Sequence, residues 1–545
     1  MNNTTICLPQ QEPHYESRLT KLERTRTQYL YDHQYIAPIP LHAVLPEADT
    51  FSGKYKQKKN RARATVLANI LINKARAVFD PFNALRHFDR VFALLPRPAT
   101  LSTWDTDAFF AEQRLSGANP MKIARVRHRD ELPFDLNSLG ASHATTLDRL
   151  LAAGQLYVAD YRDMNFVRGG LTPSGKQKYL PTPVALFYWQ ASENGKGSLL
   201  PLAIQPVAGG PVYTPGTVSA TDWFIAKLAV QIADANHHEL CSHLCHTHFV
   251  MEAFALATFR QMADNHPLHV LLSPHFRFHL ATTNLAKEKL VGPSGIVNMI
   301  LAGTLEDSQE LLSASFKSWS LKSSHPVTHT SARGLSADEL PLFPYRDDAQ
   351  LLWDAILGFV NDYVCIYYQT NADVQNDREL QAWIAELSSS EYGNARDLPA
   401  RLQTREEVAE LLALIIFNCG PQHSAVNFSQ YDYMANIPNM PMAAYCPVPA
   451  PGVLLTREAV AQEMLPDLKQ TNIQVGFAHI LTAFHQDRLG RYADGTFSDV
   501  QALKAVERFQ QRLKEIETQI DERNQDRLVP YKFLKPSEIL NSISI

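Results

Sequence analysis

The chain has 545 residues, 45% of them hydrophobic, and a formal net charge of −5. This size and composition allow a large buried core, and the charge gives no argument for nucleic acid as a partner. Six cysteines in so long a chain fit a reducing, cytoplasmic compartment rather than a disulfide framework, and no apolar run is long enough to cross a membrane.

Residues 1–100 are predicted to form an N-terminal extension of irregular and helical segments. Residues 1–53 have an irregular, proline-containing sequence. Residues 54–79 carry eight lysines and arginines and no acidic residue, with apolar residues at helical spacing at positions 66, 67, 70, 71 and 78. This pattern predicts a basic amphipathic helix. The simpler interpretation is a surface helix that packs on the core, and the alternative is a helix that lies on an anionic membrane surface.

Residues 101–545 are predicted to form one large, mainly helical domain with a few short strands. Strand-like segments with turn signals are found at residues 155–159, 183–189 and 199–204. From Thr221 onward the periodicity is mostly helical, and long helices are expected at residues 223–265, 350–368, 405–418 and 500–523. Residues 317–347 are rich in Ser, Pro and His and are expected to form a long surface connection.

Five histidines recur in the pattern H-x4-H-x4-H-x17-H-x8-H, and they are His238, His243, His248, His266 and His275. Imidazole is the commonest metal ligand in proteins. Side chains five positions apart on an ordinary α-helix point roughly 140° apart, so they cannot bind one ion. A π-type turn brings such residues back onto one face of the helix. The spacing therefore predicts a helix that is deformed to hold a metal.

A second pair of polar residues, His423 and Asn427, has the i, i+4 spacing that places both side chains on one face of a helix. Two core helices with two ligands each can hold one ion between them, and imidazole with oxygen donors favours iron or a similar metal. Two other interpretations remain open. In the first, His423 and Asn427 are a hydrogen-bonded polar pair that binds no metal. In the second, Cys241 and Cys245 form part of a zinc site, although C-x3-C is not the usual zinc spacing.

The segment from Trp223 to Arg277, with all five histidines, resembles the signature of the lipoxygenases, the non-haem iron dioxygenases of polyunsaturated fatty acids. Further similar blocks are found at residues 110–120, 154–160, 421–430 and 541–545. The resemblance implies a large helical lipoxygenase-type catalytic domain over residues 101–545, with the metal held between two core helices. Residues 1–100 show no succession of alternating strands. We therefore expect the short bacterial form, without the N-terminal lipid-binding β-barrel of many plant and animal members.

The resemblance also assigns roles to individual residues. It implies that the iron ligands are His243, His248, His423, Asn427 and the terminal carboxylate of Ile545. Iron is the expected cofactor, and manganese is the less expected alternative. His238 would be a neighbour of the site, and Glu239 and Gln430 would orient the ligands. His266 and His275 are expected to serve the structure.

By the same resemblance, the protein is expected to insert O2 into polyunsaturated fatty acids such as linoleate, linolenate or arachidonate, after hydrogen abstraction from a bis-allylic CH2. Ala286 occupies the position where the family has Ala or Gly, and this choice correlates with the chirality of the hydroperoxide product. Ala286 indicates an S product. Leu290 and Val297 are expected to shape the route by which O2 reaches the substrate. The alternatives are a fatty-acid hydroperoxide isomerase on the same fold and a metal-free lipid-binding or structural protein. We expect a cytoplasmic monomer, and peripheral membrane contact through the basic helix is the alternative to a helix that only packs on the core.

Overall fold

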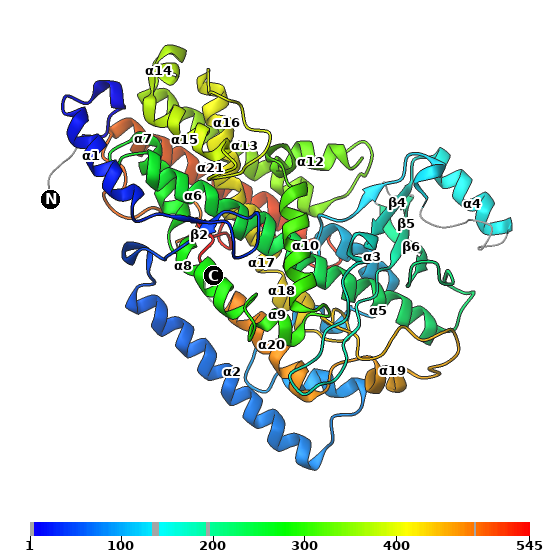
Figure 1. The fold of residues 1–545 in the computed structure, drawn as a ribbon. Coiled ribbons are helices and arrows are strands. Elements are labelled where there is room, and N and C mark those ends of the chain that lie inside the picture. The colour runs from blue at the N-terminus through cyan, green and yellow to red at the C-terminus, as the bar shows by residue number, and fades with distance from the viewer. Residues whose placement is uncertain (1–4, 133–140, 192–196, 484–486) are drawn as a thin grey trace.

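Helices make up most of the molecule, and the larger of the two small sheets in the described residues lies at its edge (Figure 1). The computed structural model describes residues 5–132, 141–191, 197–483 and 487–545. This architecture confirms the predicted, mainly helical fold with a few short strands. One hydrophobic cluster joins segments that are far apart in the sequence, because Leu8, Leu41 and Ile545 all belong to it.

The sheet has four antiparallel strands in the order β3-β4-β5-β6. The strands are β3 (Ala124–Arg125), β4 (Leu156–Asp160), β5 (Val184–Ala191) and β6 (Gly197–Gln205). The three longer strands confirm the three predicted segments. Side chains alternate between the two faces of the sheet, as the strand geometry requires. Tyr157 and Phe187 join the main core, whereas Leu156 and Leu186 pack with side chains of α4 (Ala141–Ala152).

The predicted helix over residues 223–265 consists of three successive segments. They are α5 (Ala220–His237), the π-helical segment η8 (His238–Phe249) and α6 (Val250–Gln261). Ser219 begins α5, because its hydroxyl accepts a hydrogen bond from the amide of Asp222. Almost every side chain of the three segments is buried, so they cross the core of the molecule. The π-helical segment confirms the deformation predicted from the five-residue spacing of the histidines.

A second π-helical segment occurs where only an ordinary helix was predicted. Helix α16 (Arg405–Phe417) continues into the π-helical segment η10 (Asn418–Gln422) and then into α17 (His423–Asn427). Pro421 lies inside η10, where it removes one backbone donor and disfavours regular α-helical bonding. Both η10 and α17 pack on η8. Two π-deformed segments therefore lie side by side in the core.

The other two predicted long helices are confirmed as α13 (Pro344–Tyr367) and α21 (Val500–Asn524), and α13 packs against both α16 and α21. The remaining α-helices are α3 (Asp107–Ser116), α7 (Pro267–Leu272), α8 (His279–Lys289), α9 (Ile296–Ile300), α10 (Leu305–Ser318), α14 (Asn371–Asn376), α15 (Arg378–Ser388), α18 (Gln430–Met434) and α19 (Arg457–Glu463). Short 3-10 turns are formed by η1 (Pro9–Gln11), η2 (Glu47–Asp49), η3 (Leu85–Val91), η4 (Ala99–Ser102), η5 (Arg129–Glu131), η7 (Arg162–Met164) and η9 (Ser273–Phe276).

The prediction of a long surface connection over residues 317–347 is wrong for much of its length. The segment contains the short helices α11 (Leu321–Ser324) and α12 (Pro326–Ala332). Leu335, Leu340 and Phe343 within it are fully buried. These apolar side chains, spaced among the Ser and Pro residues, hold the segment on the core.

The N-terminal residues are more regular than predicted. Between residues 5 and 53 the chain forms α1 (Tyr15–Arg26) and a two-stranded sheet of β1 (Tyr31–Asp32) and β2 (Leu41–His42). A buried ion pair of 2.6 Å between Arg18 and Glu379 fixes α1 to the body of the molecule. The irregular segment was predicted from local composition, which does not reveal such long-range contacts.

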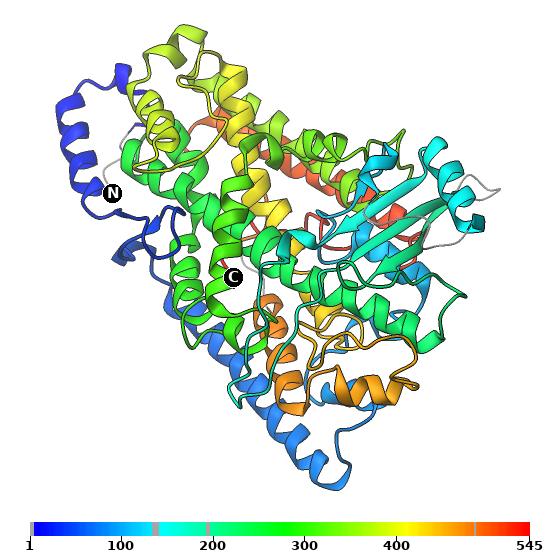
Figure 2. The ribbon, with the colours of Figure 1, turned by 45° about the vertical axis from the view of Figure 1, so that its right-hand side comes forward.

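The predicted basic helix is confirmed as α2 (Gly53–Phe79). It lies along one edge of the molecule and packs against α20 (Leu468–Thr482) (Figures 1 and 2). Val66 on its inner face is buried, whereas Leu67 and Leu71 are 62% and 66% exposed. Among the residues that the structure describes, no helix is both long enough and apolar enough to cross a bilayer.

Candidate metal centre and its cavity

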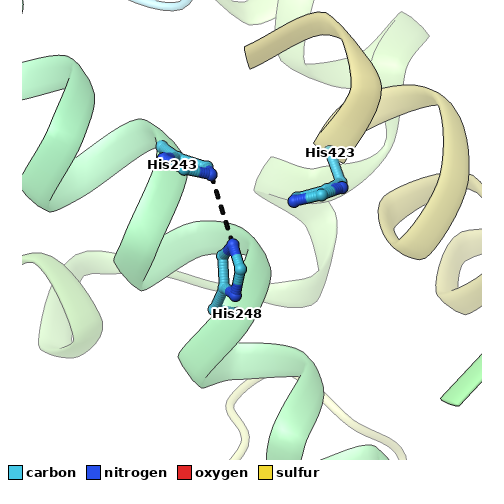
Figure 3. A group of neighbouring side chains, drawn as sticks. All are labelled: His243, His248 and His423. Atoms are coloured by element: carbon cyan, nitrogen blue, oxygen red, sulfur yellow. Dashed lines mark hydrogen bonds between the residues drawn. The ribbon is translucent and has the colours of Figure 1, made fainter. Parts of the chain in front are cut away.

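Three imidazoles meet in the core of the molecule. His243 and His248 project from η8, and His423 reaches the same point from the start of α17 (Figure 3). One ring nitrogen from each lies within 4.8 Å of the other two, and all three side chains are buried. Within the described ranges, no other His, Cys, Asp or Glu group of three converges in this way.

The π-helical turn brings His243 and His248 onto the same face of the helix. Their Nε2 atoms are 3.2 Å apart. Two nitrogens that bind one ion at right angles, each at about 2.1 Å, are about 3.0 Å apart. The observed separation therefore fits two adjacent ligands of one metal ion.

The protonation and pairing of these rings also fit a metal. Burial lowers the pKa of both His248 and His423 well below the ordinary value, so both rings are neutral and have a free lone pair. Neither ring nitrogen of His423 has a hydrogen-bond partner among the described residues. A buried polar atom without a partner is unfavourable. A cation bound between the rings removes this penalty, and its other ligands would come from nearby oxygen atoms.

Neighbouring groups hold the imidazoles in place. Glu239 Oε2 lies 3.4 Å from Nδ1 of His243, and Nε2 of His279 donates to the main-chain carbonyl of His248 at 2.8 Å. His238, in contrast, donates from Nε2 to the main-chain carbonyl of Val426 at 2.8 Å. His238 is therefore a neighbour of the three converging rings and not one of them.

The two other histidines of the five-histidine pattern have structural contacts. His266 begins α7, where its Nδ1 accepts from the amide of Leu268, and its Nε2 lies 2.9 Å from the carboxylate of Asp377. His275 donates from Nδ1 to the main-chain carbonyl of Asn541 at 2.8 Å. This contact fixes the C-terminal segment, so the expected structural roles of both residues agree with their contacts.

Asn427 and Ile545 lie in the same buried region. The Asn427 amide donates from Nδ2 to the main-chain carbonyl of Leu481 at 2.9 Å, and its Oδ1 accepts from Nε2 of Gln430 at 3.2 Å. These two bonds fix the direction of the amide. Ile545 is 3% exposed and lines the same cavity as His243 and His248.

An apolar cavity of about 450 Å³ extends from the histidines toward the surface between α2, α8, α9 and α20. Ala286, Leu290 and Val297, the three residues predicted to control oxygen insertion, all line it. Other lining residues include Val66, Ile70, Leu244, Leu285, Ile296, Met299, Ile300, Leu301, Met442, Ile473, Phe477, Ile480 and Leu481. The volume is in the usual range of small-molecule sites, and the lining suits a hydrocarbon chain.

Three basic residues also line this cavity, and the sequence analysis gave none of them an individual role. Lys59 and Arg63 belong to α2 and Lys289 to α8. Lys59 is buried, its Nζ lies 4.5 Å from the centroid of the Phe51 ring, and burial lowers its pKa to about 8. For Lys59 and Arg63 the only sequence signal was the general basic character of residues 54–79, and for Lys289 there was none.

Comparisons with known proteins agree with this geometry. The lipoxygenase family model matches residues 48–533. The chain is 35% identical over 496 residues to the linoleate 9/13-lipoxygenase of Pseudomonas aeruginosa, covering 85% of this chain and 70% of that protein. It is 33% identical over 453 residues to the human hydroperoxide isomerase ALOXE3, covering 81% of this chain and 62% of that protein.

A third relative is about twice as long as the part that matches this chain. The allene oxide synthase-lipoxygenase protein of Plexaura homomalla is 30% identical over 574 residues, which cover 97% of this chain and 53% of that protein. The chain thus spans about half the length of that relative. A crystal structure of a lipoxygenase in complex with arachidonate has a TM-score of 0.90 at 29% identity, covering 99% of this chain and 84% of that one. On the family match, the converging histidines and the shared fold, the chain belongs to the lipoxygenase family.

Proposed function

We propose that this protein is a non-haem iron dioxygenase that inserts O2 into polyunsaturated fatty acids such as linoleate, linolenate or arachidonate and releases fatty-acid hydroperoxides. One observation carries the proposal. An apolar cavity of about 450 Å³ is lined by three basic residues and by two of the three converging imidazoles. A fatty acid has the same distribution of chemistry, with one anionic end and a long apolar chain.

The proposed iron ligands are His243, His248, His423, the amide oxygen of Asn427 and the α-carboxylate of Ile545. Nitrogen and oxygen donors without thiolate favour iron, with manganese as the alternative. When bound, the iron would supply the one-electron chemistry that removes a hydrogen atom from the bis-allylic carbon of the substrate. Glu239 and Gln430 orient ligands, through the contacts to His243 and Asn427 described above.

The chain's own contribution is to position the substrate. The apolar walls exclude water and hold the pentadiene beside the imidazoles, while Lys59, Arg63 and Lys289 attract the carboxylate. Ala286 leaves space for oxygen on one side of the substrate, and Leu290 and Val297 narrow the route to it. By this assignment Ala286→Gly changes the position or chirality of oxygen insertion, which chiral chromatography of the products measures.

We further propose that α2 contacts membrane surfaces. Its outer face exposes Leu67, Leu71, Val78 and Phe79 beside its basic residues, and its inner face lines the cavity. A helix with this pattern binds anionic bilayers through both its charge and its apolar residues. Replacing Leu67 and Leu71 by Asp should weaken binding to phosphatidylglycerol vesicles about tenfold or more, because two exposed leucines that enter the bilayer would contribute several kcal/mol. The matched control is Leu503→Asp on α21, which is 45% exposed; an equal loss in the control would contradict the proposal.

The experiment that tests the main proposal measures conjugated-diene absorbance with linoleate and O2, together with metal content, on one purified sample. We expect diene formation with about one iron per chain, since the three rings form one site. His423→Ala should lose both iron and diene formation. Full iron without diene would favour the second candidate, a hydroperoxide isomerase, which the similarity to ALOXE3 makes worth testing with a supplied hydroperoxide. The absence of both iron and diene formation would favour a metal-free lipid-binding protein.

The protein is also expected to be a monomer, and gel filtration should give the corresponding mass.

A further inference from the structure

A strap formed by residues 31–42 connects α6, which continues directly from the η8 segment with His243 and His248, to α8, which carries Ala286. The strap comprises β1, β2 and the residues between them. It precedes residue 48, where the match to the lipoxygenase family model begins. Two of its side chains, Tyr35 and His42, contact α8.

His42 bridges two helices. Its Nδ1 lies 2.7 Å from Oε1 of Glu252, and its Nε2 lies 3.2 Å from Oδ1 of Asn284. Glu252 follows His248 by one helical turn in α6, and Asn284 belongs to α8. His42 and Glu252 are both fully buried, so water does not weaken their interaction. The imidazole therefore connects the helix of a proposed ligand to α8.

The strap also holds α8 at Lys287. The Lys287 amine donates to the main-chain carbonyl of His42 at 2.7 Å, and the main-chain carbonyl of Lys287 accepts from the Tyr35 hydroxyl at 2.6 Å. The amine lies 5.2 Å from the centroid of the Tyr35 ring. Because Lys287 directly follows Ala286, these contacts fix the turn of α8 that presents Ala286 to the cavity.

The opposite end of α8 is joined to the same ligand. His279, the first residue of α8, donates to the main-chain carbonyl of His248 at 2.8 Å. Helix α8 is thus tied to His248 directly at its beginning, and through His42 and Glu252 near its end. The distance from Ala286 to the imidazole cluster is set by both connections.

We propose that Tyr35 and His42 are positioning residues that determine where, and on which face, oxygen enters the substrate, because they fix Ala286 relative to His248. This inference rests on the proposed dioxygenase function. Competing products arise from barriers that differ by only a few kcal/mol, so a small displacement of α8 changes their ratio. Loss of one of these hydrogen bonds should shift the isomer ratio roughly 2- to 10-fold.

The test uses three variants of the full chain. Tyr35→Phe removes only the hydroxyl that binds the carbonyl of Lys287. His42→Ala removes the imidazole between Glu252 and Asn284 but leaves the hydrogen bond from the main-chain amide of His42 to Glu252. His33→Ala is the matched control, because His33 lies in the same strap but contacts the carbonyl of Glu391 rather than α8. Each variant is measured for iron content, for the positional and chiral ratio of products from linoleate, and for amide hydrogen exchange of residues 279–289.

We expect Tyr35→Phe and His42→Ala to keep their iron, to change the isomer ratio and to exchange α8 amides faster, while His33→Ala resembles the wild type. An unchanged isomer ratio at full iron in both variants overturns the inference, even if exchange increases, because the strap would then be merely structural. Absence of any product from the wild type would instead contradict the proposed function, and hydrogen exchange alone would then decide whether the strap holds α8. If His42→Ala does not fold, Tyr35→Phe still decides between these outcomes.

Discussion

The hydroxyl of Tyr55 donates a hydrogen bond to the main-chain carbonyl of Ser544, next to Ile545. Tyr55 belongs to the first turn of α2 and is 1% exposed. The contact joins α2, which lines the cavity, to the residue that directly precedes Ile545, whose carboxylate is a proposed ligand. The position of Ile545 therefore depends on an N-terminal helix.

Tyr55→Phe should weaken retention of iron, because the segment that carries the proposed carboxylate ligand loses one of its attachments. Removing a buried hydrogen bond reduces stability by roughly 0.5–1.5 kcal/mol, so we expect iron loss to a chelator to accelerate about 2- to 10-fold. The measurement is iron content against time in the presence of a chelator. The control is Tyr15→Phe on α1, because α1 does not line the cavity. Equal rates of iron loss in the two variants would refute the role of Tyr55.

Glu239→Gln should lower metal affinity. The Glu239 carboxylate lies 3.4 Å from Nδ1 of His243 and increases the electron donation of that ring. Loss of such a partner typically reduces metal affinity about 10- to 100-fold. Competition with a chelator of known affinity measures the change. The control is Glu515→Gln on the exposed face of α21, which should leave the metal affinity unchanged. If the Glu239 variant binds metal with wild-type affinity, the contact between Glu239 and His243 does not orient that ligand.

Gly476→Ala should push α2 away from α20 at the cavity. A Cβ at Gly476 would lie 2.6 Å from Cγ1 of Val66, and the branched Val66 side chain has little freedom to move. Overpacking of this kind destabilises a protein by about 1–3 kcal/mol. We expect a lower Tm and a higher KM for linoleate, and Val66→Ala in the same chain should restore both. Failure of Val66→Ala to restore them would show that the two residues do not compete for space.

The buried pair of His42 and Glu252 predicts how stability depends on pH. Burial lowers the pKa of His42, but the Glu252 carboxylate outweighs burial, so the pKa lies above the ordinary 6.5. The groups that interact with His42 are Glu252 from α6, Asp49 from η2, and three residues of α8: His279, Asn284 and Lys287. A raised histidine pKa gives stability that is complete below pH 6.5 and is lost as the pH rises through the folded-state pKa.

Urea unfolding between pH 6 and pH 9 should therefore show a fall in the free energy of unfolding that is larger for the wild type than for His42→Gln. The comparison removes the contribution of all other titrating groups, provided the variant keeps the same fold. Parallel pH profiles for the two proteins would mean that His42 does not gain a proton on folding.

The metal centre was predictable from sequence where local spacing carries the information. The five-residue interval between His243 and His248 is incompatible with one face of an ordinary helix, so it indicated a π-helical turn that holds a metal. The choice of His243 and His248 over His238 as ligands came only from the resemblance to lipoxygenases. The interval between His423 and Asn427 fits an ordinary helix, and it gave no sign of the π-helical segment η10 before them. The strands and the long helices were found because their periodic patterns extend over enough residues.

Features that depend on long-range packing were not predictable. Lys59 and Leu67 lie in one basic segment, and only the contact between α2 and α20 decides that Lys59 faces the cavity and Leu67 faces outward. Nothing in the sequence around His42 indicates its bond to Glu252, which is 210 residues away. The Ser- and Pro-rich residues 317–347 suggested a surface loop, because composition does not show that Leu335 fills a space in the core.

The contact between His238 and Val426 has a consequence for the order of assembly. It joins η8 to α17 across 188 residues, and the imidazoles of His243 and His423 meet at the same junction. Contacts between such distant segments form late, because the loop between them must first be organised. A metal ion held between His243 and His423 would therefore bind only after these two segments have met. We expect newly made chains to reach a nearly native, metal-free state before the proposed iron binds, so that the supply of metal would limit the fraction of loaded protein.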